Sequence, residues 1–325
     1  MAREVSAPSL FQIGYYWEAK IFLTSVKLDV YTPLATHPLH VEEIAAQIKV
    51  DPIYLGRLLD ALVTMGLLGR EGTRYANTPV VSEFLVKTSP FYMGELMLLQ
   101  DMEWDHWGHL EEVIRSGRPK VRGNIFMNRP EAGQLVLKVL HRMAQRVAPA
   151  LAQQIDLSSY RTFLDVGGGA GTFSMAFCRK YPALQATLFD LSKTLPFTAR
   201  SLEEGDMEDR VELVSGNFNQ DAFPGTFDVI FMSDILHYQT HEENAALIQK
   251  CREATAPGGM IIVKDMFLGE EASHPGWNAI FSMHLLVYTE NGQCFKQDEA
   301  RSWMMKAGFH TLREVERNTV LTALK

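Results

Sequence analysis

The sequence predicts two domains, a mainly α-helical first part and an α/β, Rossmann-like second part. With 325 residues, the chain is long enough for two hydrophobic cores. A short apolar run at 162–166 leads into four glycines within the five positions 167–171. After this run, apolar strand patterns alternate with helical ones, which is typical of a parallel sheet that binds its ligand at the carboxyl ends of the strands.

Composition excludes several classes of protein. The content of 46% hydrophobic and 22% charged residues is that of a globular protein, and the net charge of −8 disfavours a nucleic-acid or anionic-membrane partner. Cys178, Cys251 and Cys294 cannot all pair and show no C-x-x-C spacing, so we expect reduced thiols and a cytoplasmic location. Charges interrupt the apolar stretch Leu10–Leu28, so neither a signal peptide nor a membrane span is predicted.

The first part of the chain has the element order of a winged helix. Leu10–Leu28 and Val41–Ile48 have helical spacing of apolar residues. Asp51 is placed to cap a third helix that begins at Pro52, and Leu67–Tyr75 has the pattern of a small hairpin.

Two functions fit this winged-helix pattern. DNA binding would require basic residues on the third helix, where Tyr54–Thr64 carries only Arg57. A role in dimerisation is therefore the preferred interpretation.

The middle of the chain is rich in methionine and aromatic residues over Glu83–Glu112. Such residues usually form a core, but they also suit the wall of a pocket for a flat substrate. The substrate-binding candidates from this region and from the irregular segment 116–130 are Met97, Trp104, Phe126 and Met127. Glu131–Ile155 predicts a long helix that bends or restarts at Pro149. We divide the chain into a dimerisation domain (1–100), a helical linker and pocket wall (101–155) and a ligand-binding domain (156–325).

The second part repeats strands and helices. Its first strand carries Phe163, Leu164 and Val166, and a helix follows at Thr172–Lys180. Further strands are predicted at Gln185–Phe189, Val211–Ser215, Phe227–Met232 and Met260–Asp265, with helices at Pro196–Glu203, Glu242–Thr255 and Asp298–Lys306 and a terminal hairpin of Phe309–Glu316 with Thr319–Leu324.

The glycine loop indicates a nucleotide-type ligand. Its glycines permit positive φ and remove side chains that would keep a ligand away, and the following helix points backbone N–H groups at the loop. Asp190 closes the second strand, where a carboxylate can accept both hydroxyls of a ribose. Dinucleotide enzymes use the same device, but here Thr172 stands where the third glycine of G-x-G-x-x-G belongs. The alternative is that these glycines form only a tight turn.

Five motifs together resemble those of the S-adenosylmethionine-dependent small-molecule O-methyltransferases. They are, in order, Leu164-Asp165-Val166-Gly167-Gly168-Gly169-Ala170-Gly171-Thr172, Phe189-Asp190-Leu191, Gly216-Asn217-Phe218, Ile235-Leu236-His237 and Ala256-Pro257-Gly258-Gly259. This family includes plant caffeate and acetylserotonin-type enzymes and bacterial polyketide and pigment methyltransferases. The resemblance covers essentially the whole chain. It implies a mixed seven-stranded sheet, an N-terminal winged-helix dimerisation domain, a homodimer and S-adenosyl-L-methionine as the cofactor.

The resemblance also implies which residues bind the cofactor. Gly167 and Gly169 would lie against its methionine part, Asp190 would bind the ribose, and Asn217 with Phe218 would border the adenine, although the family more often has Asp-Phe there. The remaining cofactor candidates are Asp165, Leu191, Met232, Ser233 and Lys264. No metal site is expected.

His237 matches the catalytic histidine of the family, and Asp265 matches the acidic residue beside it. An imidazole titrates near neutrality, so His237 could take a proton from a phenol, although a lone histidine is more often structural. The second acidic partner of the family is replaced by Cys294, so either Glu290 substitutes for it or one carboxylate suffices. His241 suits the role less well, because a helix N-terminus disfavours its protonation.

The acceptor would be a flat, largely apolar molecule. In the family the region corresponding to Trp277–Tyr288 lines the acceptor pocket, and here it contributes the candidates Trp277, Phe281 and His284. The expected function is methyl transfer to a hydroxyl of an aromatic or polyketide-like acceptor. The alternatives are N- or C-methylation, other chemistry with the same cofactor, or a winged-helix regulatory protein.

Overall fold

The computed structural model describes residues 14–121, 130–269 and 276–325. The chain divides into two compact units, Met1–Trp104 and Asp105–Lys325, and each is described by itself. Among the described helices, none is both long and apolar enough to cross a bilayer.

The first unit contains the predicted helices and hairpin. Its elements are α2 (Trp17–Lys27), α3 (Val41–Ile48), α4 (Pro52–Thr64), β1 (Leu68–Glu71), β2 (Arg74–Asn77) and α5 (Pro79–Leu85). The Asp51 carboxylate accepts hydrogen bonds from the N–H groups of Ile53 and Tyr54, so the predicted cap of α4 is confirmed. Residues 10–13 of the predicted first helix lie outside the described residues. Tyr31, Ile44, Leu59 and Leu62 are fully buried in the core of this unit.

Helix α6 (Gly94–Trp107) begins in the first unit and ends in the second, and α7 (Leu110–Ser116) and α9 (Pro130–Gln154) follow it. The predicted restart of the last of these helices at Pro149 is wrong, because α9 is one continuous helix with Pro149 inside it. Ala148 and Ala152, on either side of this proline, are fully buried in the same core as α10 (Thr172–Lys180). Tertiary packing therefore outweighs the local preference of proline.

The second unit is built on the predicted mixed seven-stranded sheet, and its strand order is β5-β4-β3-β6-β7-β9-β8. The strands are β3 (Thr162–Val166), β4 (Gln185–Asp190), β5 (Val211–Ser215), β6 (Phe227–Ser233), β7 (Thr255–Lys264), β8 (His310–Glu316) and β9 (Val320–Leu324). The first five run parallel, and the terminal hairpin adds β9 antiparallel to β7 and β8 antiparallel to β9. The fifth strand starts at Thr255 rather than at the predicted Met260, because the Pro257-Gly258-Gly259 turn is an irregularity within β7.

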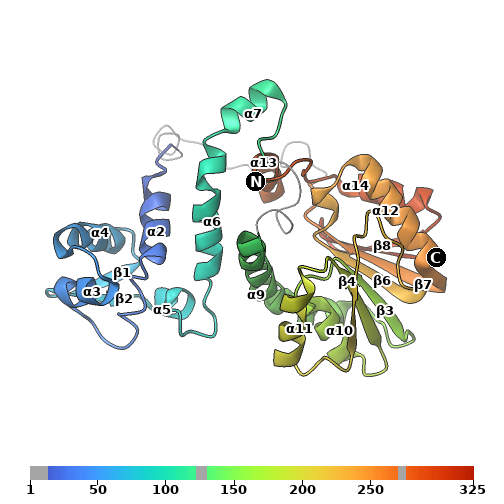
Figure 1. Cartoon of the computed structure of the whole chain (residues 1–325), viewed down its shortest axis with the longest axis horizontal. Helices are drawn as coiled ribbons and strands as arrows, with labels where there is room; N and C mark the ends of the chain where they lie inside the picture. Colours follow the sequence, from blue (N-terminus) through green and yellow to red (C-terminus); the bar gives the residue numbers. More distant parts are fainter. Residues whose placement is uncertain (1–13, 122–129, 270–275) are drawn as a thin grey trace. The chain divides into compact units, whose positions relative to one another are not determined.

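Helices cover both faces of this sheet (Figure 1). One core is shared by the sheet with α9, α10 and α11 (Leu195–Glu204), and the other by the sheet with α12 (His241–Ala254) and α14 (Gln297–Lys306). Both faces of the central strands are therefore buried, which explains their nearly continuous apolar sequences. The polar groups of a site must lie at the strand ends, and Val166 pairs with Met232 and Ser233 with Lys264 at the same carboxyl edge.

Candidate active site

The glycine loop follows β3 between β4 and β6 at this edge. Gly167, Gly169 and Gly171 have φ values of +66°, +55° and +75°, a region that other residues adopt only with strain. A Cβ atom on Gly167 would lie 2.5 Å from the Cδ1 atom of Ile235 and 3.4 Å from the Phe218 ring. The positive φ, together with the close approach of these side chains, therefore favours glycine at position 167.

Asp190 at the end of β4 is tied to this loop. Its Oδ2 accepts a hydrogen bond from the Gly169 N–H at 2.8 Å, and its Oδ1 accepts one from the Leu191 N–H at 2.7 Å. Burial raises the pKa of Asp190, and these N–H groups oppose the shift. The Thr194 side chain also hydrogen-bonds to this carboxylate, so Asp190 retains acceptor capacity for one further hydroxyl group.

Two of the predicted cofactor residues lie within the protein behind the loop. Asp165 is 2% exposed and accepts a hydrogen bond from the Ser174 hydroxyl at 2.5 Å, which ties β3 to α10. Burial raises the pKa of Asp165 to about 7, although the bond from Ser174 opposes this shift. Met232 is fully buried in the core. Asp165 and Met232 are therefore placed to support the loop from behind. A direct contact of either residue with the cofactor stays a prediction.

The end of β5 supplies the next pair of candidates. The Asn217 Oδ1 accepts a hydrogen bond from the Asn219 N–H at 2.9 Å, which leaves this oxygen one further acceptor position. The Phe218 ring reaches toward Gly167, while the Phe218 carbonyl accepts a bond from the Lys250 ammonium. Both residues are half-buried beside the loop.

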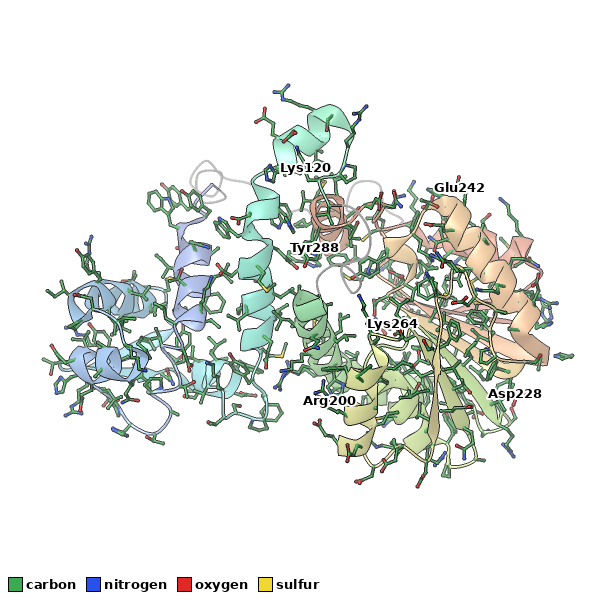
Figure 2. The ribbon with its side chains drawn as sticks, in the orientation of Figure 1. Lys120, Arg200, Asp228, Glu242, Lys264 and Tyr288 are labelled. Carbon is green, nitrogen blue, oxygen red and sulfur yellow. The ribbon has the colours of Figure 1, made fainter. Side chains whose placement is uncertain are left out.

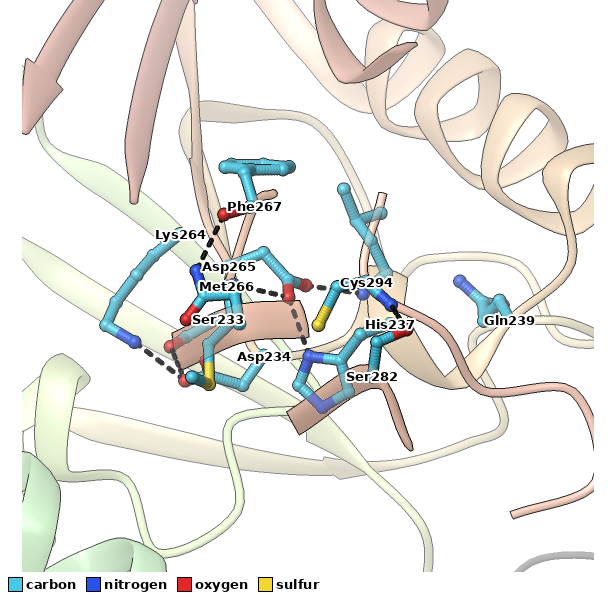
Figure 3. Close-up of polar contacts among 12 residues, drawn as sticks. Ser233, Asp234, His237, Gln239, Lys264, Asp265, Met266, Phe267, Ser282 and Cys294 are labelled. Atoms are coloured by element: carbon cyan, nitrogen blue, oxygen red, sulfur yellow. Dashed lines mark hydrogen bonds and ion pairs between the residues drawn. The ribbon is translucent and has the colours of Figure 1, made fainter. Parts of the chain in front are cut away.

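His237 and Asp265 form a buried pair at the ends of β6 and β7 (Figure 3). His237 lies in the short 3-10 helix η1 (Leu236–Tyr238), and its Nδ1 is 2.6 Å from the Asp265 Oδ1. The Asp265 carboxylate also accepts bonds from the N–H groups of Leu236 at 2.9 Å and Met266 at 2.7 Å. A carboxylate that receives two N–H groups is held as an acceptor, so Nδ1 carries the proton and Nε2 is the basic nitrogen of the ring.

Opposing effects set the pKa of His237. Burial lowers it, whereas the charge and hydrogen bond of Asp265 and the charge of Asp234 raise it, and Lys264 lowers it. The balance places the pKa of His237 above its ordinary value. The ring is 3% exposed, so these interactions act with little screening by water.

Asp234 is a site residue that the motifs did not reveal. It follows β6 with a φ of +58°, and its Oδ2 lies 2.8 Å from the Lys264 Nζ and 2.6 Å from the Ser233 hydroxyl. One ligand-type atom from each of Asp234, His237 and Asp265 lies within 4.8 Å of the other two. The ammonium of Lys264 on Asp234 makes this group an unfavourable site for a cation. The sequence feature that could have indicated Asp234 is a carboxylate residue directly after a buried strand.

Cys294, the residue expected at the position of the family's second acidic residue, lies near Asp265. Its thiol is 4% exposed and is drawn beside the pair of His237 and Asp265 in Figure 3. Burial raises the pKa of Cys294 to about 12, and the Asp265 carboxylate adds to this shift. Glu290, the proposed substitute, is an exposed residue after α13 (Trp277–Tyr288).

Helix α13 brings a row of aromatic rings to His237. The Phe281 ring meets the His237 imidazole edge-on, with 5.5 Å between the ring centroids. The His284 ring stacks on Phe281 at a centroid distance of 5.5 Å, and Tyr288 stacks on His284 at 5.3 Å. Burial lowers the pKa of His284 to about 4, and the neighbouring His237 and His106 add to the shift. Trp277, at the start of the helix, is 68% exposed.

The other acceptor candidates are placed differently. Met97 packs against the core of the first unit, and the Trp104 ring lies 4.5 Å from the Lys20 ammonium in the same unit. Phe126 and Met127 lie outside the described residues. The structure therefore brings Phe281 and His284 toward His237, and the substrate-binding roles of all seven candidates stay predictions.

Comparisons with known proteins identify the family. Residues 107–310 match the family model of an O-methyltransferase domain, and residues 11–87 match an O-methyltransferase dimerisation domain. The chain is 30% identical over 304 residues to the tetracenomycin polyketide synthesis 8-O-methyl transferase TcmO of Streptomyces glaucescens, which spans 92% of this chain and 89% of that protein. The chain belongs to the S-adenosylmethionine-dependent O-methyltransferase family.

Solved structures agree with this O-methyltransferase fold. A family member from Burkholderia thailandensis superposes with a TM-score of 0.90 at 26% identity, over 99% of both chains. Human N-acetylserotonin methyltransferase in complex with SAM superposes with a TM-score of 0.86 at 22% identity, over 100% of this O-methyltransferase and 99% of that chain. The match to the dimerisation domain also agrees with the preferred interpretation of the first part.

Proposed function

We propose that this O-methyltransferase methylates a hydroxyl of a small aromatic or polyketide-like acceptor, with His237 as the general base. The observation that carries the proposal is the buried pair of His237 and Asp265, whose Nδ1 to Oδ1 distance is 2.6 Å. The relationship to the polyketide 8-O-methyl transferase TcmO supports the acceptor class.

The residues around the glycine loop fit S-adenosylmethionine. The positive φ at Gly167 favours glycine there, and Asp190 retains acceptor capacity for a ribose hydroxyl. We assign the ribose to Asp190, the methionine part to Gly167 and Gly169, and the adenine edge to Asn217 and Phe218.

His237 would act while the methyl group is transferred. When bound, S-adenosylmethionine supplies an electrophilic methyl group, whose bond to sulfur breaks with its electron pair as the acceptor oxygen bonds to the carbon. His237 takes the hydroxyl proton at Nε2, and Asp265 keeps the ring oriented through Nδ1 and stabilises the imidazolium that forms. Because the Leu236 and Met266 N–H groups hold Asp265, the ring is oriented before the acceptor arrives.

The row of rings on α13 would bind the acceptor. Phe281 and His284 present flat, uncharged surfaces next to His237, since His284 is neutral well below pH 7. Such surfaces stack against an aromatic ring and would place its hydroxyl near Nε2. We also propose that the protein acts as a homodimer through its dimerisation domain.

Two measurements test the proposed function. We expect S-adenosylmethionine to raise the unfolding temperature of the purified protein, because a ligand that binds only the native state stabilises it. Incubation with S-adenosylmethionine carrying a labelled methyl group and a panel of naphthols, polyketide phenols and aromatic amines should label phenolic oxygen. Labelling of the amines alone would contradict the assignment of oxygen as the acceptor atom.

A further inference from the structure

We propose that Asp234 supplies the second carboxylate for His237 and that Lys264 holds Asp234 in place. This inference rests on the proposed role of His237 and assigns positioning roles to two residues outside the pair of His237 and Asp265. It also offers a replacement for the family's second acidic residue, since Cys294 is an uncharged thiol at neutral pH and Glu290 is exposed.

The geometry places Asp234 between a lysine and the base. Its Oδ2 lies 2.8 Å from the Lys264 Nζ, and an oxygen of the same carboxylate lies within 4.8 Å of a ring nitrogen of His237. The side chains of Lys264 and Asp234 are 16% and 28% exposed. Figure 2 shows Lys264 at the carboxyl edge of the sheet, away from Asp228 near the start of β6. The four groups Lys264, Asp234, His237 and Asp265 therefore form one charged cluster at this edge.

The backbone around Asp234 supports a specific role. Asp234 has a φ of +58°, a conformation that aspartate and asparagine tolerate better than most residues. Its N–H donates to the Lys264 carbonyl at 2.8 Å, and the Ser233 hydroxyl donates to its carboxylate at 2.6 Å. The carboxylate is thus held by β6 and β7 together, independently of any ligand.

Charge balance explains why a lysine accompanies this second carboxylate. When His237 holds the proton of the acceptor, two positive groups, the imidazolium and Lys264, face two negative groups, Asp234 and Asp265. Without Lys264, two uncompensated carboxylates would hold the proton on His237 too tightly, and the ring would enter the reaction already protonated. The lysine therefore limits the rise in the pKa of His237 that the two carboxylates cause.

Other titratable groups also face His237 in the described part of the chain. They are Tyr238 from η1, His284 from α13 and Cys294 from the segment before α14. His284 and Cys294 carry no charge at neutral pH, because burial moves the pKa of His284 to about 4 and that of Cys294 to about 12. Substitutions of Asp234 and Lys264 should therefore change the pKa of His237 without a contribution from the charge of His284 or Cys294.

The experiment is a titration of the His237 ring by NMR, in protein labelled at its histidine carbons and saturated with S-adenosylhomocysteine. The signal is assigned by its loss in His237→Gln. The pKa of His237 should fall by about 0.5 to 2 units in Asp234→Asn and rise by a similar amount in Lys264→Met. The double variant should return close to the parent value. Glu290→Gln, which removes the exposed carboxylate after α13, is the matched control and should leave the titration unchanged.

Activity provides a second readout. If His237 is the base, the acid limb of kcat against pH with a naphthol acceptor should move in the same directions as the NMR titration. An unchanged His237 titration in Asp234→Asn, or a shift in Glu290→Gln instead, would overturn the inference. Asp234→Gly, which also tolerates the positive φ, replaces Asp234→Asn if that variant does not fold. Full methylation by His237→Ala would instead contradict the proposed general base, so the two failures are distinguishable.

Discussion

The two halves of the site are built in different ways. The donor half, around β3 and β4, offers backbone groups and one carboxylate, and the Gly169 N–H ties its loop to Asp190. The base half, around β6 and β7, consists of charged side chains that come from separate segments and hold one another. We therefore propose that the donor half sets affinity for the cofactor, whereas the base half sets the rate and its pH dependence.

The largest expected effect separates the two halves through His237. We expect His237→Ala to lower kcat by ~10²–10⁴, because the acceptor proton then has no positioned base. Binding of S-adenosylhomocysteine, measured by calorimetry, should stay within a few-fold of the parent. A large loss of this affinity would show that the halves are not independent.

Asp190→Ala should produce the opposite pattern. Removal of the carboxylate eliminates its bonds to the Gly169 and Leu191 N–H groups and would also eliminate its proposed contact with the ribose. We expect the Kd of S-adenosylhomocysteine to rise by about 10- to 100-fold. At saturating S-adenosylmethionine, the acid limb of the profile of kcat against pH should stay at the same pH as in the parent. A shift of this limb would contradict the division into two halves.

Asp165 gives the donor half a pH-dependent stability. Its pKa in the folded protein is about 7, against the ordinary aspartate value of 3.8. The folded state then holds a proton that the unfolded chain releases between these values, so this group reduces stability as the pH rises from about 4 to 7 and has a constant effect above that range. Relative to Asp165→Asn, the unfolding temperature of the parent should fall across this window in thermal scans. A constant difference between the two proteins would contradict the raised pKa.

The smallest expected effect concerns the aromatic row in the base half. His284→Phe preserves a flat ring next to Phe281 and removes a group that is already uncharged at neutral pH. We expect the KM for a naphthol acceptor to change by less than about tenfold, with the acid limb of kcat unmoved. A displaced limb in the pH profile would show that His284, and not only His237, titrates in the assay range.

The local geometry of the donor half follows more directly from the sequence than the side-chain contacts of the base half, for a physical reason. The glycine loop and Asp190 are local features, because strand, turn and helix propensities decide them within a few residues. The ion pair between Asp234 and Lys264 joins residues 30 positions apart, and it depends on the register that aligns Ser233 with Lys264. The sequence therefore indicates only a cofactor role for Lys264, and it does not indicate that Asp234 belongs to the site.

Pro149 inside α9 and the irregular start of β7 are two places where the structure departs from the expected periodicity. In α9, Ala148 and Ala152 flank the proline on a buried face, and the helix continues through it. In β7, the strand includes the Pro-Gly-Gly turn and continues beyond it. Single-residue propensities are weak compared with such burial.

The most direct test of the central claim, that His237 removes the acceptor proton, compares acceptors of different acidity. Single-turnover rates of the parent and of His237→Ala would be measured with S-adenosylmethionine in excess, for a naphthol and for an electron-poor phenol that is already ionised at the assay pH. We expect a large loss of rate in the variant with the naphthol. With the ionised phenol we expect a much smaller loss, because that acceptor needs no base. An equal loss with both acceptors would contradict the role of His237 as the base.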